Sequence, residues 1–175
     1  EGEIIAFGWR DGALQLLWAA PTPYTDVQAL TGATFQGRRG VAVVAHEKYG
    51  DGRRRRFRIV APFAWDTRRQ ALVAAGADMR SVQRFFPKGL QTYLTSGAMD
   101  SPDNSTLGLV VDGGAYLMQM DGSGALTMDW ATDLDRVVAP TFLDLVADGR
   151  DEFLFSRLGF LSVLSADPAP NGESR

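Results

Sequence analysis

The sequence predicts an all-β or β-dominated α+β domain of antiparallel meanders, with one or two helices inserted near residues 66–86. Three observations favour this fold class. Asp-Gly pairs recur along the chain, and this dipeptide tolerates the positive φ angles of tight hairpin turns. Short apolar runs flank these pairs, as paired strands require. The apolar share of 45% over 175 residues is enough for a buried core without disulfides.

Each Asp-Gly pair marks an expected chain reversal. The pairs begin at Asp11, Asp51, Asp112, Asp121 and Asp148. Apolar runs around them predict strands over residues 4–9, 13–18, 41–45, 55–60, 107–111, 115–120, 125–130, 141–146, 152–155 and 160–164. Several runs are apolar throughout, which suits strands covered on both faces. The strands group into four blade-like units near residues 1–36, 37–64, 107–136 and 137–165. Such units could form a closed propeller, a partial propeller or a two-sheet sandwich.

The middle of the chain breaks the strand pattern. Asp66 can cap a helix over residues 67–75, which Gly76 would end. A second short helix is expected over residues 79–86, because apolar side chains there share one helical face and Pro87 follows them.

The remaining segments are expected to be irregular. Residues 95–105 are small and polar, which predicts an exposed loop. Residues 166–175 are polar and contain proline, which predicts a flexible tail. No shift in composition marks a domain boundary, so residues 1–165 are expected to form a single β-rich domain.

The most specific motif of the chain lies at residues 144–155, Asp-Leu-Val-Ala-Asp-Gly-Arg-Asp-Glu-Phe-Leu-Phe. It resembles the calcium loop of FG-GAP/VCBS repeats, which build integrin-like β-propellers. The family pattern reads roughly D-x-D-G-D-G-x-x-D-L and precedes an apolar strand. Asp144, Asp148 and Glu152 fall on acidic positions of that pattern. Residues 1–18 and 37–44 are weaker matches. The resemblance implies a propeller-like fold, a role in binding and a calcium site.

A calcium ion at this loop would be held by carboxylates. Calcium prefers roughly six to eight oxygen ligands, and alternating loop positions point their oxygens inward. Asp144, Asp148 and Glu152 would supply them, with Asp151 nearby. The loop departs from the pattern at Val146, which replaces an oxygen ligand, and at Ala147, which replaces a glycine. The alternative is a tight turn without metal, and no cofactor other than Ca²⁺ is expected.

The densest charge run is Arg-Arg-Arg-Arg-Phe-Arg at residues 53–58. Because side chains alternate along a strand, Arg54, Arg56 and Arg58 are expected on one face and Arg53 on the other. The run can contact an acidic protein, grip phosphates or pair with the acidic second half of the chain. The first 90 residues carry +6 and the other 85 carry −9, which together give the net −3. Since the chain is acidic overall, nucleic acid is a disfavoured partner.

Candidate catalytic groups are few. The chain has no cysteine, which excludes a cysteine nucleophile and a thiolate metal site. His46 is the only histidine, and no G-x-S-x-G motif supplies a serine to it. Asp129, Asp133 and Asp135 can form an acid/base pair of the kind that glycosidases use, or serve as solvated turn residues. Core or rim packing is expected, ahead of ligand stacking, for Trp9, Trp18, Trp65 and Trp130.

Three function classes follow. The first is a non-enzymatic binding module for a protein or a glycan, which the FG-GAP/VCBS resemblance implies. The second is a small immunity- or inhibitor-type protein that binds through the basic strand face. The third is a carboxylate- or metal-dependent hydrolase, which predicts a pocket with at least two acidic groups of perturbed pKa.

The expected location is periplasmic or secreted, in a bacterium, with the cytoplasm left open. The chain opens at Glu1 rather than at methionine, as it would after removal of an export signal. No apolar run approaches the roughly 20 residues that a membrane-spanning helix needs, so no membrane span is expected.

Overall fold

The fold is known from a computed structural model, which describes residues 3–21, 24–48, 54–77, 92–111, 114–132 and 137–165. Within these ranges the chain forms thirteen strands in four antiparallel sheets, and it forms no helix. The predicted class of antiparallel meanders is therefore confirmed. No helix suited to crossing a membrane occurs in the same ranges.

The first two sheets come from the N-terminal half of the chain. The strands β1 (Glu3–Arg10) and β2 (Ala13–Pro21) form a two-stranded hairpin. The second sheet has the strand order β3-β4-β5-β6, with bounds Tyr24–Phe35, Arg38–Lys48, Arg54–Asp66 and Ala71–Ala74. Each strand pairs with the next one in sequence, so this sheet is a simple meander.

The other two sheets repeat this plan. The third sheet has the order β7-β8-β9-β10, with bounds Thr92–Ser101, Asn104–Val111, Gly114–Met120 and Leu126–Thr132. The fourth has three strands, β11 to β13, with bounds Val137–Leu143, Glu152–Arg157 and Phe160–Leu164. In each of these sheets, strands that follow one another in sequence also lie side by side, so no strand is inserted from another part of the chain.

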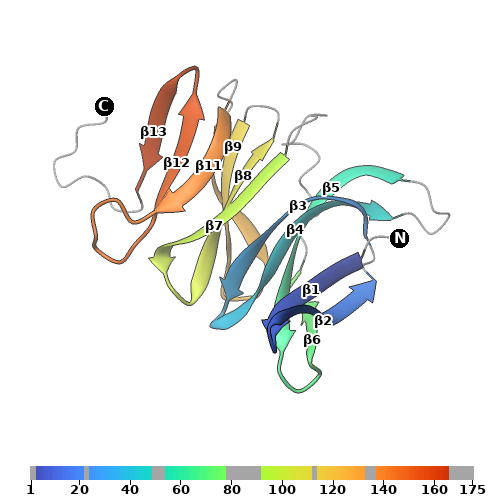
Figure 1. Ribbon diagram of the computed structural model, residues 1–175. Coiled ribbons are helices and arrows are strands. Elements are labelled where there is room, and N and C mark those ends of the chain that lie inside the picture. The colour runs from blue at the N-terminus through green and yellow to red at the C-terminus, as the bar shows by residue number, and fades with distance from the viewer. Residues whose placement is uncertain are drawn as a thin grey trace.

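The second, third and fourth sheets stack in chain order, so the third sheet lies between the other two (Figure 1). Successive side chains of a strand point to opposite faces, so the third sheet serves two cores. On β8, Leu107 and Leu109 pack with the second sheet around Phe35, whereas Val110 packs with the fourth sheet around Phe153. The apolar runs of β8 and β9 are thus explained by burial on both faces.

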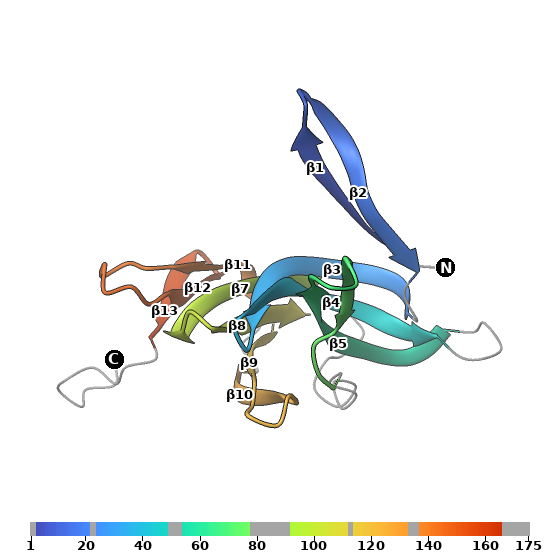
Figure 2. The same ribbon diagram turned by 90° about the horizontal axis from the view of Figure 1, so that it is seen from below.

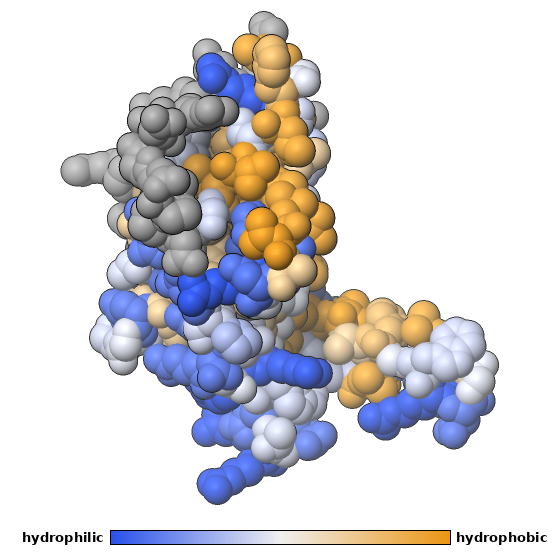
Figure 3. Space-filling view, turned by 90° about the vertical axis from the view of Figure 1, so that its left-hand side faces the viewer, coloured by the Kyte–Doolittle hydropathy of each residue, from blue (hydrophilic) through white to orange (hydrophobic). Residues whose placement is uncertain are grey.

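The β1–β2 hairpin projects away from this stack, as Figure 2 and Figure 3 both show. Its contact with the second sheet includes Trp18 of β2 and Trp65 of β5, whose ring centroids lie 6.4 Å apart in an edge-to-face arrangement. This geometry is a favourable one for aromatic pairs. Most of the hairpin's large apolar side chains nevertheless remain exposed.

The expected reversal at Asp11-Gly12 is confirmed. Both residues have positive φ angles, 51° and 75°, and they join β1 to β2 as a two-residue turn. The Asp-Gly pairs at 51–52 and 112–113 lie outside the described residues, but the strands that flank them pair as expected. Two more turns of this type use other residues before glycine, at Gln36-Gly37 and Leu158-Gly159.

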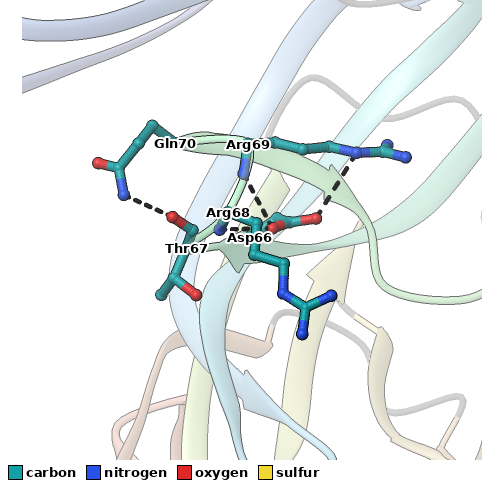
Figure 4. A network of polar contacts seen from close by, with 5 residues as sticks. All are labelled: Asp66, Thr67, Arg68, Arg69 and Gln70. Atoms are coloured by element: carbon teal, nitrogen blue, oxygen red, sulfur yellow. Dashed lines mark hydrogen bonds and ion pairs between the residues drawn. The ribbon is translucent and has the colours of Figure 1, made fainter.

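The predicted helix over residues 67–75 is wrong. Asp66 does cap the following turn, because its Oδ1 accepts hydrogen bonds from the amides of Arg68 at 2.8 Å and Arg69 at 3.1 Å (Figure 4). Gln70 then adopts a φ of 51°, which ends the helical geometry after one turn. The chain reverses into β6, which pairs with β5, so pairing in the sheet overrides the local helix preference.

Two other expectations are wrong, and two more concern residues that the structure does not describe. Residues 95–105 are not a loop: β7 extends to Ser101 and pairs with β8, and Gly97 lets the ring of Phe142 approach its backbone. The blade-like units 1–36 and 37–64 are incorrect, since the second sheet spans residues 24–74 and includes the unpredicted strand β3. The predicted helix over 79–86 and the predicted tail 166–175 lie outside the described residues.

Candidate functional site

A pocket of about 420 Å³ lies beside the core shared by the third and fourth sheets. Its walls come from all four strands of the third sheet and from the end of β13. Its lining residues are Met99, Asp100, Thr106, Leu117, Gln119, Asp129, Trp130, Leu164 and Ser165. Carboxylates, an amide, hydroxyls and an indole ring therefore meet around a space of the size that small-molecule sites have.

Irregular strand pairing places both carboxylates at the pocket. In β10 the register shifts between Met128 and Trp130, so Asp129 has no partner on β9. Met128 packs on the side of the second sheet, and Trp130 packs on the side of the fourth. In β7 the register shifts after Gly97, which leaves Asp100 in an unpaired stretch. Bulges of this kind re-aim side chains and are common beside functional sites.

Asp151 supports the irregular stretch of β7. Its Oδ2 accepts a hydrogen bond from the Ala98 amide at 2.7 Å, and its own amide donates to the Ala98 carbonyl at 3.0 Å. These two bonds satisfy backbone groups that have no partner on β8. Asp151 of the predicted calcium loop therefore holds the strand segment that carries Asp100.

Gln119 links the polar groups of the pocket. Its Nε2 donates to the carboxylate of Asp100 and to the hydroxyl of Thr106, the latter at 2.6 Å. Thr106 is buried, so this hydrogen bond is shielded from water. The network fixes the orientation of the Gln119 amide before any ligand arrives.

Asp129 has a perturbed carboxyl group. Partial burial raises the pKa of Asp129 above its ordinary value of 3.8, a hydrogen bond from the Thr127 hydroxyl opposes this, and the negative charge of Asp100 adds to the rise. As a whole residue Asp129 is exposed, and it lines the pocket. A raised pKa makes this carboxyl a better proton carrier near neutral pH than an ordinary aspartate.

Trp130 forms an aromatic wall beside the carboxylates. Its ring centroid lies 6.3 Å from that of Phe155, with the two planes tilted by 38°. This contact packs Trp130 against the core of the fourth sheet, and Trp130 also lines the pocket. The sequence offers packing and ligand contact as alternatives for the tryptophans. Trp130 both packs against the fourth sheet and lines the pocket.

The predicted calcium ligands use their carboxylates for backbone hydrogen bonds. Asp144 accepts from the amides of Asp148 at 3.1 Å and Gly149 at 2.9 Å, and Glu152 accepts from the Leu145 amide at 2.8 Å. Across the described parts of the chain, no three or more acidic or histidine side chains gather as a metal-binding group. These bonds organise the loop without an ion, and the calcium site stays a prediction.

The predicted basic face and the histidine are described through their backbone alone. Arg54, Arg56 and Arg58 lie in β5, and Arg53 precedes the described part of that strand. His46 lies in β4, where it pairs with Arg58. Binding through these arginines stays a prediction. Asp133 and Asp135, the proposed companions of Asp129, lie outside the described residues.

Sequence reasoning missed Asp100 and Gln119 as site residues. Asp100 falls in the segment that was expected to be a loop, and Gln119 is one polar residue in an otherwise apolar strand. A single polar residue within such a strand was the one available signal at Gln119. The strand irregularity that brings Asp100 to Asp129 has no local sequence signature.

Comparisons with known proteins add no relative. No family model, no curated protein and no solved structure matches this chain.

Proposed function

We propose that this chain is a non-enzymatic binding module that takes a neutral, hydroxyl-rich ligand of the glycan class in the pocket of the third sheet. The observation that carries this proposal is the meeting of Trp130 with Asp100, Gln119 and Asp129 around one space. Met99, Leu117 and Leu164 supply apolar surface beside these polar groups, and a few placed polar groups are what orient a ligand in a binding site.

The chemistry of these side chains matches that of a sugar. Ionised carboxylates are strong acceptors for hydroxyl donors, and the hydrogen bonds that they form are stronger than those of neutral acceptors. The indole offers a flat apolar surface on which the C–H face of a pyranose can pack. Because Gln119 is already held by Asp100 and Thr106, little rotamer freedom is lost there on binding.

The arrangement of the sheets supports a binding role without naming the ligand. Sheets stacked in chain order are compatible with a propeller-like architecture, in agreement with the role that the FG-GAP/VCBS resemblance implies. A fold hosts many functions, so the pocket residues, rather than the architecture, must decide the ligand class.

Calorimetric titration of the whole chain with glucose, galactose, N-acetylglucosamine and cellobiose tests the proposal. We expect binding of at least one sugar, weakened about tenfold or more by Asp100→Asn or Trp130→Ala, since a hydrogen bond to a charged group contributes about 1.5–3 kcal/mol. Asp103→Asn is the matched control, because Asp103 is an exposed aspartate near the end of β7. Binding that Asp100→Asn and Asp103→Asn affect equally, or no binding at all, would refute the proposal.

A hydrolase is the second candidate, and one observation favours it. The pocket holds two carboxyl groups, and the pKa of Asp129 is raised by burial and by the charge of Asp100. Glycosidases use two carboxyl groups of this kind, one as a proton donor and the other as a base or nucleophile. In that case Asp129 would be the proton donor and Asp100 the base or nucleophile.

Chromogenic nitrophenyl glycosides distinguish the two candidates. A hydrolase releases nitrophenol at a rate that falls in Asp129→Asn, with an alkaline limb that reports the pKa of the proton donor. A binding module releases none, although the same glycosides still bind. Release at an unchanged rate in Asp129→Asn would remove the assignment of the acid.

A further inference from the structure

The first sheet of the chain presents an apolar face to solvent. In the β1–β2 hairpin, Phe7 pairs with Leu16 and Trp9 pairs with Leu14, so these side chains and Ile5 share one side. We call these five residues the hairpin face. All of them are exposed, and Trp9 is 73% exposed. At roughly 200 Å² for a fully exposed large side chain, they present roughly 600 Å² of apolar surface.

An exposed hairpin of this kind lacks the support that a stable sheet needs. An isolated two-stranded hairpin is marginal in water, because it has no further strands or helix to cover its apolar side. Apolar patches of several hundred Å² on a soluble protein mark interaction sites. The hairpin projects from the stack, which places its face where another molecule can reach it (Figure 2).

The last sheet presents a second apolar face at the other end of the stack. Register places Leu143 opposite Glu152, Val163 opposite Leu154, and both Val138 and Leu161 opposite Ser156, all on the side away from Phe153. We call Val138, Leu143, Leu154, Leu161 and Val163 the terminal face. Leu154 is covered by its neighbours, whereas Leu161 is 68% exposed. Figure 3 looks onto this end of the molecule and shows apolar side chains gathered there.

The two faces have similar size. The exposed side chains of the terminal face present roughly 350 Å², and Leu145 and Val146 in the loop after β11 add roughly 200 Å². In the third sheet, by contrast, both faces are covered by neighbouring sheets. The second and fourth sheets cover the two faces of the third, whereas the hairpin and the fourth sheet each leave one apolar face open.

We propose that the hairpin face of one copy covers the terminal face of a second copy, and that two such contacts close a two-fold dimer. One hairpin face against one terminal face together with Leu145 and Val146 would bury roughly 1,100 Å², and two such contacts would bury roughly 2,200 Å², as stable dimers require. Contact between two hairpins would leave both terminal faces open. The reciprocal arrangement covers all four apolar faces, and closure prevents an open filament.

The mass in solution tests this association directly. Light scattering after size exclusion, between roughly 1 and 100 µM, is expected to give twice the chain mass of 19.0 kDa. Trp9→Glu on the hairpin face and Leu161→Glu on the terminal face should each shift the protein to the monomer. Leu30→Glu is the matched control, because Leu30 is an exposed leucine of β3 that lies on neither face.

Mixing the two variants identifies which faces touch. Each variant keeps one intact face, so an equimolar mixture of Trp9→Glu and Leu161→Glu should regain a fraction of dimer that neither forms alone. A dimer that Leu161→Glu leaves intact would overturn the proposal in favour of hairpin-to-hairpin contact. A wild-type monomer at all concentrations, or a ladder of larger species, would also overturn it. Unchanged thermal melting of each variant monomer shows that loss of the dimer is not loss of the fold.

Discussion

At the scale of single residues, Asp129 has the clearest physical signature. Because its pKa is raised, the folded state binds its proton more tightly than the unfolded chain does. The stability that this group contributes is therefore greatest below pH 3.8 and declines as the pH rises through the folded pKa. At neutral pH the ionised carboxylate of Asp129 slightly destabilises the folded state, which is common for groups at functional sites.

Replacement of Asp129 by Asn should remove this destabilisation, because the amide carries no charge. We expect Asp129→Asn to raise the free energy of unfolding at pH 7 by about 0.5 kcal/mol or less, as is typical of surface substitutions. The melting temperature should rise slightly as a result. The gain should shrink as the pH falls towards 3.8, because the wild-type carboxyl is then protonated in both states. Thermal melting of both proteins between neutral and acidic pH checks the sign, and a gain that grows on acidification would contradict it.

The turn between β9 and β10 depends on one aspartate and one glycine. The Ser123 hydroxyl and the Ala125 amide donate to Asp121 at 2.6 Å and 3.0 Å, and these bonds, led by that of Ser123, lower the pKa of Asp121. The stability contributed by Asp121 is therefore present above pH 3.8 and is lost as the pH falls below it. Gly124 adopts a φ of 82°, whereas Gly122 does not have a positive φ.

The two glycines of this turn should respond differently to alanine. Gly124→Ala forces a side chain into the left-handed region and should destabilise the fold by about 1 kcal/mol. Gly122→Ala is the control, since a β-carbon there meets no atom within 4 Å. Urea unfolding of both variants gives the comparison, and equal effects would show that backbone conformation is not the cause.

At the scale of elements, the contacts between sheets explain why small residues occur in strands. A β-carbon on Gly108 of β8 would overlap the ring of Phe153 of β12, and one on Gly97 of β7 would overlap Phe142 of β11. These glycines let the aromatic rings of the fourth sheet pack directly on the backbone of the third. The distance between the two sheets is therefore set in part by glycine.

Alanine at Gly108 should push these sheets apart. We expect Gly108→Ala to cost about 1–3 kcal/mol, the usual range for overpacking a core. For a chain of this size, each 1 kcal/mol lowers the melting temperature by about 2–4 °C. Gly32→Ala serves as the control, because Gly32 of β3 also lies within a strand but faces open space. Similar melting temperatures for both variants would contradict the predicted overlap.

The loop between β11 and β12 offers a test of the calcium prediction. Its carboxylates bond to backbone amides, and Ala147 adopts a φ of 58° where the FG-GAP/VCBS pattern has glycine. If calcium binds here, melting in calcium and then in excess chelator must show a higher melting temperature with the ion, by mass action. Asp148→Asn should abolish that increase. Equal melting temperatures in both conditions would leave the loop as a turn held by its own hydrogen bonds.

At the scale of the whole molecule, stability is distributed unevenly along the stack. The third sheet is buried on both faces, whereas the hairpin is a projecting pair of strands (Figure 2). Local opening is easiest where few apolar contacts must break. The middle of the stack should therefore be the most stable part of the chain, and the hairpin the least.

Amide hydrogen exchange should reveal this gradient. We expect the slowest exchange in β8 and β9 and the fastest among the hydrogen-bonded amides of β1 and β2. At high protein concentration, a dimer that covers the hairpin should slow exchange there, and Trp9→Glu should reverse the slowing. Uniform protection in β1 and β8 at low concentration would contradict the gradient.

Local sequence patterns correctly predict the fold class, many of the strands and the turn at Asp11-Gly12. These features depend on local physics, namely the alternation of side chains along a strand and the positive φ angles that Asp-Gly accepts. The sequence also identified Asp66 as a cap, but not that the chain would reverse after one turn. Local capping is compatible with both outcomes, and pairing of β6 with β5 decides between them.

The pocket and the open apolar faces result from tertiary packing and are not predicted by the local sequence. Asp100 and Asp129 are distant in sequence and meet because β7 and β10 belong to one sheet with irregular register at both residues. Likewise, the apolar runs of β8 and β1 look alike in sequence, yet one is buried between two sheets and the other faces water. An apolar pattern records that a side chain can be buried, whereas long-range packing determines what covers it.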